Sequence, residues 1–274
     1  MTKKTKNFIT APLPFMGQKR NFLKDFNKAL ENYPDNAIYV DLFGGSGLLS
    51  HTVKQLYPKA RVIYNDYDNF SKRLQNIAKT NALLADIRVI LEGYPKDKKI
   101  DDPYKSAILS RLELEDKAGF VDWITISSSI LFSGKYHLNL QEFQKATLYN
   151  TIRMSDYSAD GYLEGVERVA DDYKKIFQAF KDNECVVFLV DPPYLSTDVK
   201  AYKSYWKLAD YLDVLTVLDG TRYFYFTSNK SSIIELCEWI ENSTVGNPFK
   251  DANRSFVTNS VNFNATYTDI MVFK

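Results

Sequence analysis

The sequence predicts an α/β fold: a mostly parallel β-sheet that ends in an antiparallel hairpin, with a mostly helical lobe inserted into it. In both end regions of the chain, short apolar runs of strand length alternate with amphipathic helical segments, as in parallel sheets. Residues 254–273 instead alternate apolar and polar side chains, which is typical of a closing hairpin. Residues 87–162 break the first pattern, and this break predicts the inserted lobe.

Length and composition narrow the possible classes of protein. The chain has 274 residues, 45% of them apolar, which suits one large domain or a domain with an insert. A net charge of +1 gives no overall attraction for nucleic acid, so any such binding must use local patches. No run is long and apolar enough to span a membrane, and no secretory signal follows the basic start, so we expect a cytoplasmic protein.

The two cysteines and two histidines form no cluster, so we expect no zinc site. Cys185 is predicted to lie in a buried strand and Cys237 in a helix, both as core thiols and not as a disulfide.

The elements before the lobe follow from spacing and from turn residues. Residues 1–13 resemble a flexible basic arm. Phe22, Leu23, Phe26 and Leu30 recur at helical spacing, and Pro34 ends that pattern. The pattern therefore predicts helices over 21–33, 48–56 and 68–84, and strands over 37–40 and 61–64.

The elements after the lobe are assigned in the same way. The periodicity predicts helices over 165–180, 206–218 and 231–240. Strands are predicted over 185–190 and 222–226, and the hairpin over 254–261 and 265–273. Within the lobe, Asp102-Pro103-Tyr104 reads as a turn and the start of a helix.

A glycine turn follows the first strand and opens a helix. Glycines let the backbone approach a ligand closely, and the helix start offers free N–H groups. The turn is neither a P-loop, because no Gly-Lys-Ser/Thr closes it, nor a complete G-x-G-x-x-G. Asp66 follows the next strand, about 20 residues on, where an acid takes ribose hydroxyls in dinucleotide sites. The alternative is a helix N-cap, and both roles can hold at once. The turn comprises Asp41, Leu42, Phe43, Gly44, Gly45, Ser46 and Gly47.

A later strand ends in Asp191-Pro192-Pro193-Tyr194. The carboxylate follows the strand's carboxyl end, where open α/β sheets bind ligands. The prolines stiffen the turn and remove two N–H donors, so the carbonyls of Asp191 and Pro192 can face a ligand. A carboxylate, free carbonyls and an aromatic ring suit a planar group that carries an amino nitrogen. The alternative is a strand followed by an ordinary proline turn.

Together these three motifs resemble those of amino-methyltransferases that use S-adenosylmethionine. Their order resembles the alpha group, the Dam-like D12 class of DNA adenine-N6 methyltransferases. The resemblance extends to Phe15-Met16-Gly17-Gln18-Lys19 and to Thr227-Ser228-Asn229. Gln18 departs from the family, which has a second glycine there, and Asn262-Phe263-Asn264 replaces a basic, glycine-containing turn. A family stretch rich in Asn, Arg and Phe is missing near 140–165.

The resemblance implies a Rossmann-like methyltransferase sheet over 1–86 and 163–274, and a target-recognition lobe over 87–162. It implies that S-adenosylmethionine is the cofactor and double-stranded DNA the partner, without metal, membrane or a predicted oligomer. The implied catalytic residues are Asp191, Pro192, Pro193 and Tyr194, with the Tyr194 ring stacking on a flipped adenine. The implied cofactor residues are Phe15, Met16, Gly17, Lys19, Asp41, Phe43, Gly44, Gly45, Ser46, Gly47, Asp66 and Asp191.

The resemblance also implies that Lys19 and the backbone amides of residues 44–47 bind the cofactor carboxylate, and that Asp41 binds its amino group. Other substrates stay open, because cytosine N4 and adenines of RNA also present a conjugated amine. A non-catalytic DNA-binding protein of the same ancestry is a further alternative. The double proline and the incomplete glycine motif argue against a nucleotide-binding oxidoreductase.

Overall fold

The computed structural model describes residues 8–132, 136–193, 206, 208–229, 231–241, 247–262 and 265–274. The chain divides into two compact units. The sheet unit comprises Met1–Thr10, Gln18–Asp68 and Gly161–Lys274, and the helical unit comprises Ala11–Gly17 and Asn69–Asp160. The main part of the helical unit, Asn69–Asp160, is therefore inserted between the second and third strands of the sheet unit. Its short segment Ala11–Gly17 comes before the first strand.

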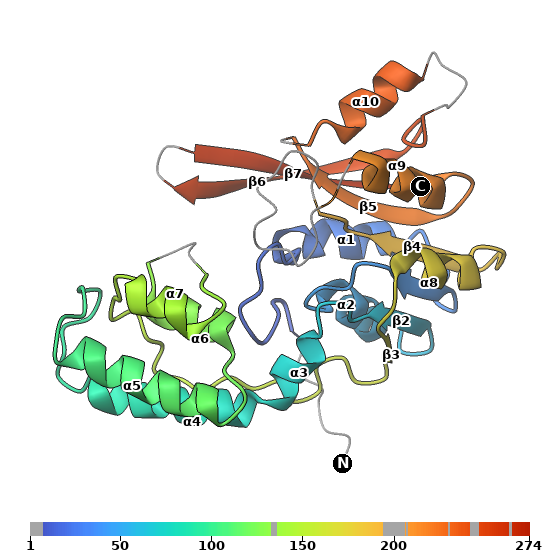
Figure 1. Ribbon diagram of the computed structural model, residues 1–274. Coiled ribbons are helices and arrows are strands. Elements are labelled where there is room, and N and C mark those ends of the chain that lie inside the picture. Colours follow the sequence, from blue (N-terminus) through green and yellow to red (C-terminus); the bar gives the residue numbers. More distant parts are fainter. Residues whose placement is uncertain are drawn as a thin grey trace. The chain divides into compact units, whose positions relative to one another are not determined.

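The sheet unit is built on a seven-stranded sheet in the described residues, in the order β3-β2-β1-β4-β5-β7-β6 (Figure 1). Strands β1 to β5 are parallel, whereas β7 runs antiparallel to β5 and forms a hairpin with β6. This arrangement confirms the predicted fold class. The strands are β1 (Ile38–Asp41), β2 (Arg61–Asn65), β3 (Glu167–Val169), β4 (Val186–Val190), β5 (Tyr223–Ser228), β6 (Asn253–Asn262) and β7 (Ala265–Phe273).

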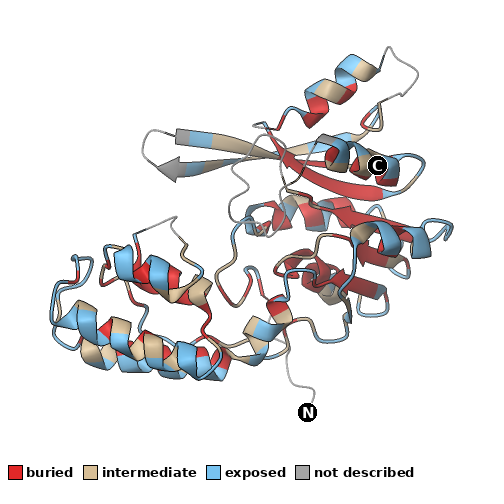
Figure 2. Cartoon of the chain, in the orientation of Figure 1, coloured by how far each residue is buried: buried red, intermediate tan, exposed pale blue. Residues whose placement is uncertain are grey.

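Both faces of this sheet are covered, because successive side chains of a strand point to opposite faces. On β4, Val187 and Leu189 pack with residues of α1 and α2, whereas Phe188 and Val190 pack with residues of α8, α9 and α10. Figure 2 shows the central strands as buried. The helices of this unit are η1 (Arg20–Phe22), α1 (Leu23–Leu30), α2 (Leu48–Leu56), α8 (Tyr173–Phe180), α9 (Leu208–Leu218) and α10 (Ile233–Ile240).

The helical unit contains α3 (Phe70–Gln75), α4 (Ile77–Ile90), α5 (Tyr104–Lys117), α6 (Trp123–Ile130) and α7 (Leu140–Lys145) (Figure 1). Helix α5 packs against both α4 and α7. Side-chain caps start two of the helices: Asp122 accepts from the Thr125 amide at α6, and Asn139 accepts from the Glu142 amide at α7. Among the residues that the structure describes in both units, no helix is long and apolar enough to cross a membrane.

The sequence predicts the lobe over 87–162, whereas the helical unit starts at Asn69. The difference arises because α4, which spans the expected boundary, packs along α5 and belongs with it. The predicted helix over 68–84 is two helices that meet at Asn76. The predicted start of a helix at Asp102-Pro103-Tyr104 is confirmed, since α5 begins at Tyr104.

Other predictions were wrong. The expected helix over 165–180 is strand β3 followed by α8; β3 has only three residues, none fully buried, so it shows no apolar run. Within 1–13, the described part is not a flexible arm, because Phe8 is buried against the rings of His51 and Tyr162. Cys185, which was predicted to be a core thiol in a buried strand, is exposed just before β4. The prediction for Cys237 is confirmed, because this residue is buried in α10.

Candidate active site

Three aspartates stand at the carboxyl ends of three neighbouring parallel strands. Asp41 ends β1, Asp66 follows β2, and Asp191 follows β4. Asp41 is level with Tyr64 on β2 and with Leu189 on β4, so Asp66 and Asp191 each lie two residues beyond that level. The chain leaves β1 toward β2 and later returns to β4 on the other side. The gap between β1 and β4 is therefore a topological switch point, the place where open α/β sheets bind ligands.

Asp191 forms an ion pair with Lys19 across this point. The Lys19 Nζ lies 2.6 Å from Asp191 Oδ2, and the two side chains are only 6% and 18% exposed. Burial raises the pKa of Asp191 to about 6, against the opposing effect of the Lys19 ammonium, while Asp269 of β7 adds to the rise. Lys19 therefore favours the ionised form of the motif's carboxylate, a role that the sequence did not suggest.

Asp41 is 1% exposed, and one of its two carboxylate oxygens has no hydrogen-bond partner within the described residues. Its Oδ2 accepts a 2.7 Å hydrogen bond from the Ser50 hydroxyl of α2, whereas its buried Oδ1 has no partner there. Burial raises the pKa of Asp41 to about 7, and the hydrogen bond from Ser50 opposes that rise. A buried acceptor of this kind fits a ligand that brings a donor, such as an amino group.

The buried carboxyl of Asp41 should make the protein less stable as the pH rises. Its pKa is raised above the unfolded value, so the folded state binds more protons and loses stability between pH about 4 and 7. In Asp41→Asn this decline should shrink. The free energy of unfolding of the variant minus that of wild type should therefore rise by roughly 2–4 kcal/mol between pH 4 and pH 8. Urea unfolding at several pH values measures this, with the exposed Asp35→Asn as control. A decline equally steep in both variants would contradict the prediction.

The glycine turn is packed so closely that a side chain could not be added at two positions. A Cβ on Gly44 would lie 2.3 Å from the Tyr64 ring and 2.7 Å from the Asn65 carbonyl oxygen. Gly47 has a φ of +75°, and a Cβ there would lie 2.8 Å from the Leu163 side chain. The Gly47 amide donates to the Gly44 carbonyl at 2.7 Å, which closes the turn before α2 begins. The glycines therefore permit a tight turn against β2.

Asp66 is buried and holds two side-chain partners. Its Oδ2 accepts from Arg168 Nε of β3 at 2.7 Å, and its Oδ1 accepts from the Tyr64 hydroxyl at 3.1 Å. The alternative that Asp66 caps a helix is wrong, because α3 starts only at Phe70, with Asn69 at its N-cap. Asp66 thus stands beside the glycine turn as a fixed carboxylate.

The family of the chain follows from its similarity to known sequences. Residues 15–218 match the model of the D12 class N6 adenine-specific DNA methyltransferases. The chain belongs to this family. A Haemophilus influenzae protein named "Putative methyltransferase" is 37% identical over 279 residues, covering 98% of this chain and 93% of that protein. The chain is therefore an enzyme of the methyltransferase type.

Solved structures resemble this D12-class chain only weakly. A precorrin-6y C5,15-methyltransferase from Geobacter metallireducens has a TM-score of 0.41 and 9% identity, covering 98% of this chain and 99% of that one. An rRNA methylase from Streptococcus thermophilus has a TM-score of 0.36 and 11% identity, covering 95% and 99%. The family assignment therefore depends on sequence.

The structure describes most of the other residues that were predicted for the site. Phe43 packs against the rings of Tyr173 and Trp206. Pro192 is buried and Pro193 is partly buried, whereas Tyr194 lies outside the described residues. Phe15, Met16 and Gly17 belong to the helical unit, where the Phe15 ring packs edge-on against Phe70 at 5.5 Å. Their place in a cofactor site with Lys19 stays a prediction.

Several residues at this site are not among those predicted from the sequence. Tyr64 precedes Asp66 by two positions, and strand alternation could have put both on one side of β2. Ser50 could have been found on the first turn of α2 after the glycine turn. Arg168 lies in β3, where the periodicity indicates a helix. Tyr162 has no local signal, because it contacts the glycine turn from a distant part of the chain.

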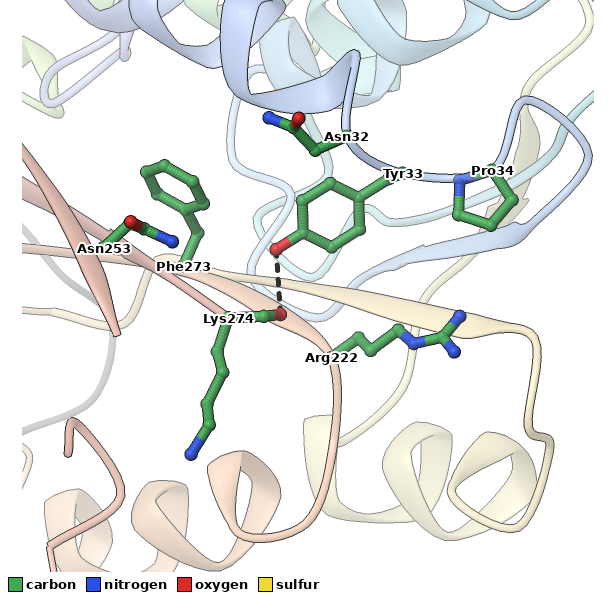
Figure 3. A pocket seen from close by; sticks show the side chains of 7 residues that line it. All are labelled: Asn32, Tyr33, Pro34, Arg222, Asn253, Phe273 and Lys274. Carbon is green, nitrogen blue, oxygen red and sulfur yellow. Dashed lines mark hydrogen bonds between the residues drawn. The ribbon is translucent and has the colours of Figure 1, made fainter. Parts of the chain in front are cut away.

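A separate cavity of about 640 Å³ opens at the opposite edge of the same sheet, near the amino ends of β1 and β5 (Figure 3). There the Tyr33 hydroxyl donates to the Lys274 carbonyl at 2.8 Å. The cavity is lined by Asn32, Tyr33, Pro34, Arg222, Asn253, Phe273 and Lys274. None of these side chains carries a carboxylate, thiol or imidazole, so the cavity lacks the acids that gather at the candidate site. In the described part of the chain, no group of three or more His, Cys, Asp or Glu residues could hold a metal ion.

Proposed function

We propose that this methyltransferase moves the methyl group of S-adenosylmethionine to the N6 amine of an adenine in double-stranded DNA. One observation carries the proposal. The carboxylate of Asp191, on its stiff double-proline turn, stands one strand away from Asp41 and the glycine turn, at the switch point of the sheet. The group proposed to bind the target amine and the groups proposed to bind the cofactor thus lie at the same edge of the sheet.

The residues of the sheet unit fit S-adenosylmethionine. The buried Asp41 Oδ1 would accept from its amino group, a donor that this oxygen lacks among the described residues. The amides at the start of α2 would take its carboxylate, as helix N-termini do for anions. The Asp66 carboxylate would accept from its ribose hydroxyls. Each end of the cofactor thus meets groups of suitable charge.

In the proposed reaction, the protein positions the target amine and stabilises the charge that develops on it. When bound, S-adenosylmethionine supplies an electrophilic methyl group on a positively charged sulfonium. The lone pair of an exocyclic amine is delocalised into its ring, so hydrogen bonds from the NH₂ to Asp191 and to the Pro192 carbonyl would free it. Positive charge that develops on the nitrogen would be stabilised by Asp191, which can also accept or relay the released proton. Lys19 favours the ionised form of Asp191, so it would keep this carboxylate able to accept from the target amine.

A base stacked within a duplex cannot reach a carboxylate at the edge of a sheet, so the target adenine would be flipped out. Tyr194 would replace part of its lost stacking, a role that is supported by the sequence motif alone. The helical unit, inserted between β2 and β3, would contribute to target recognition.

The decisive experiment is nucleoside analysis after incubation with labelled S-adenosylmethionine and either duplex DNA or RNA. N6-methyladenine in DNA supports the proposal, provided that Asp191→Asn forms it far more slowly than wild type. N4-methylcytosine, or methyladenine only in RNA, would replace the proposed substrate with one of the alternatives. Cofactor binding without transfer to either nucleic acid would point to the non-catalytic alternative.

Removal of the Asp66 carboxylate should weaken cofactor binding and leave the fold intact. Asp66→Ala should lower S-adenosylmethionine affinity by about 1–3 kcal/mol, the usual loss for hydrogen bonds to a charged group. Titration calorimetry measures this. Glu167→Ala is the matched control, because Glu167 of β3 also pairs with an arginine, Arg61, but at an exposed position. Equal affinities of the two variants would remove Asp66 from the site.

A further inference from the structure

Two buried tyrosines hold consecutive carbonyls of the glycine turn. The Tyr64 hydroxyl of β2 donates to the Gly45 carbonyl at 2.7 Å, and the Tyr162 hydroxyl donates to the Ser46 carbonyl at 2.8 Å. Burial raises the pKa of both phenols above its ordinary value, so both stay protonated and act as donors. Both rings are fixed by packing: Tyr64 closely approaches Gly44, and Tyr162 packs against His51.

These bonds also fix the amides that follow. A trans peptide unit is planar, and its C=O and N–H point in opposite directions. With the Gly45 carbonyl directed at Tyr64, the Ser46 N–H must point away from Tyr64. This amide has no partner within the described residues, whereas the Gly47 amide already donates to Gly44. The Tyr64 bond therefore orients a donor that a ligand can use.

Tyr64 also reaches the acid of the next motif. Its single hydroxyl proton is shared between the Gly45 carbonyl and, at 3.1 Å, the Asp66 Oδ1. Arg168 holds the other Asp66 oxygen at 2.7 Å. One side chain thus connects the glycine turn, predicted to meet the amino-acid end of the cofactor, to the carboxylate predicted to meet its ribose.

We propose that Tyr64 and Tyr162 are positioning residues for S-adenosylmethionine, and that Tyr64 aligns the Ser46 amide and the Asp66 carboxylate on the two ends of one cofactor molecule. The inference rests on the proposed function, because it takes that cofactor as the ligand. Tyr64 should have the larger effect, because Tyr162 orients the Gly47 amide, which the turn itself already uses.

The test compares tyrosine-to-phenylalanine variants by titration calorimetry with S-adenosylhomocysteine. Tyr64→Phe should bind about 5- to 10-fold more weakly than wild type, and Tyr162→Phe about 2- to 3-fold more weakly. The matched control is Tyr39→Phe: Tyr39 is a fully buried tyrosine of β1 whose hydroxyl donates to the Pro34 carbonyl at 3.0 Å, before the strand begins. Its affinity should equal that of wild type, although it also loses a buried hydroxyl and its hydrogen bond.

A second ligand separates positioning from general loosening of the fold. Methylthioadenosine keeps the ribose but lacks the amino-acid part. Tyr64→Phe should therefore lower the affinity for methylthioadenosine by a smaller factor than the affinity for S-adenosylhomocysteine. If Tyr64→Phe binds S-adenosylhomocysteine as well as Tyr39→Phe does, the inference is overturned and the proposed function stands. If wild type binds neither S-adenosylmethionine nor S-adenosylhomocysteine, the proposed function fails, and this inference with it.

Discussion

Replacing Asp191 by asparagine is expected to slow methyl transfer by about 10²–10⁴-fold, the range for loss of a positioned acid–base group. The asparagine keeps the size of the side chain but neither stabilises positive charge on the target nitrogen nor accepts its proton. S-adenosylmethionine affinity should change little, because its proposed contacts are Asp41, the glycine turn and Asp66. Single-turnover transfer to duplex DNA and calorimetry with the cofactor measure the two effects separately.

The chain offers a matched control for this variant. Asp102-Pro103-Tyr104 in the helical unit also places an aspartate before a proline, but its carboxylate accepts from Ser106 in the first turn of α5. Asp102→Asn should transfer at the wild-type rate. If Asp191→Asn also transfers at that rate, the double-proline tetrapeptide is only a turn, and the proposed mechanism fails.

Replacing Lys19 by methionine is expected to lower kcat/KM at pH 7 by roughly 10- to 100-fold and to let it recover near pH 9. Asp191 has a pKa of about 6, which Lys19 lowers, so the wild-type profile of kcat/KM should rise through about pH 6. Loss of the ammonium should move this rise upward by about 1–3 pH units, as for carboxylates that lose an adjacent cation. At pH 7 Asp191 would then be mostly protonated and unable to accept from the target amine.

The pH profile distinguishes this role from a purely structural one. Lys24→Met, on the exposed side of α1, should leave the position of the rise unchanged. A Lys19→Met variant that loses activity equally at every pH would show that Lys19 acts on folding or on the cofactor, and not through Asp191.

Much of the sheet unit could be predicted because its signals are local. A buried strand shows itself in a short apolar run, as in Val186–Val190, and a hairpin in alternation, as in β6 and β7. Strand β3 could not be predicted because pairing with β2, and not its own side chains, makes it a strand. The boundary of the helical unit could not be predicted for a similar reason: α4 has a local signal, but only its packing on α5 shows to which unit it belongs.

The sequence by itself determined which groups the site contains. Acids after strands, a glycine turn before a helix and the double proline follow from neighbouring residues, and their order along the chain is enough to indicate the D12 class. Only the tertiary structure decided how these groups are paired. The contacts of Lys19 with Asp191, of Tyr162 with Ser46 and of Arg168 with Asp66 join segments that are far apart in the chain. Strand order brings them together, and strand order is set by the packing of the whole sheet, which no local pattern encodes.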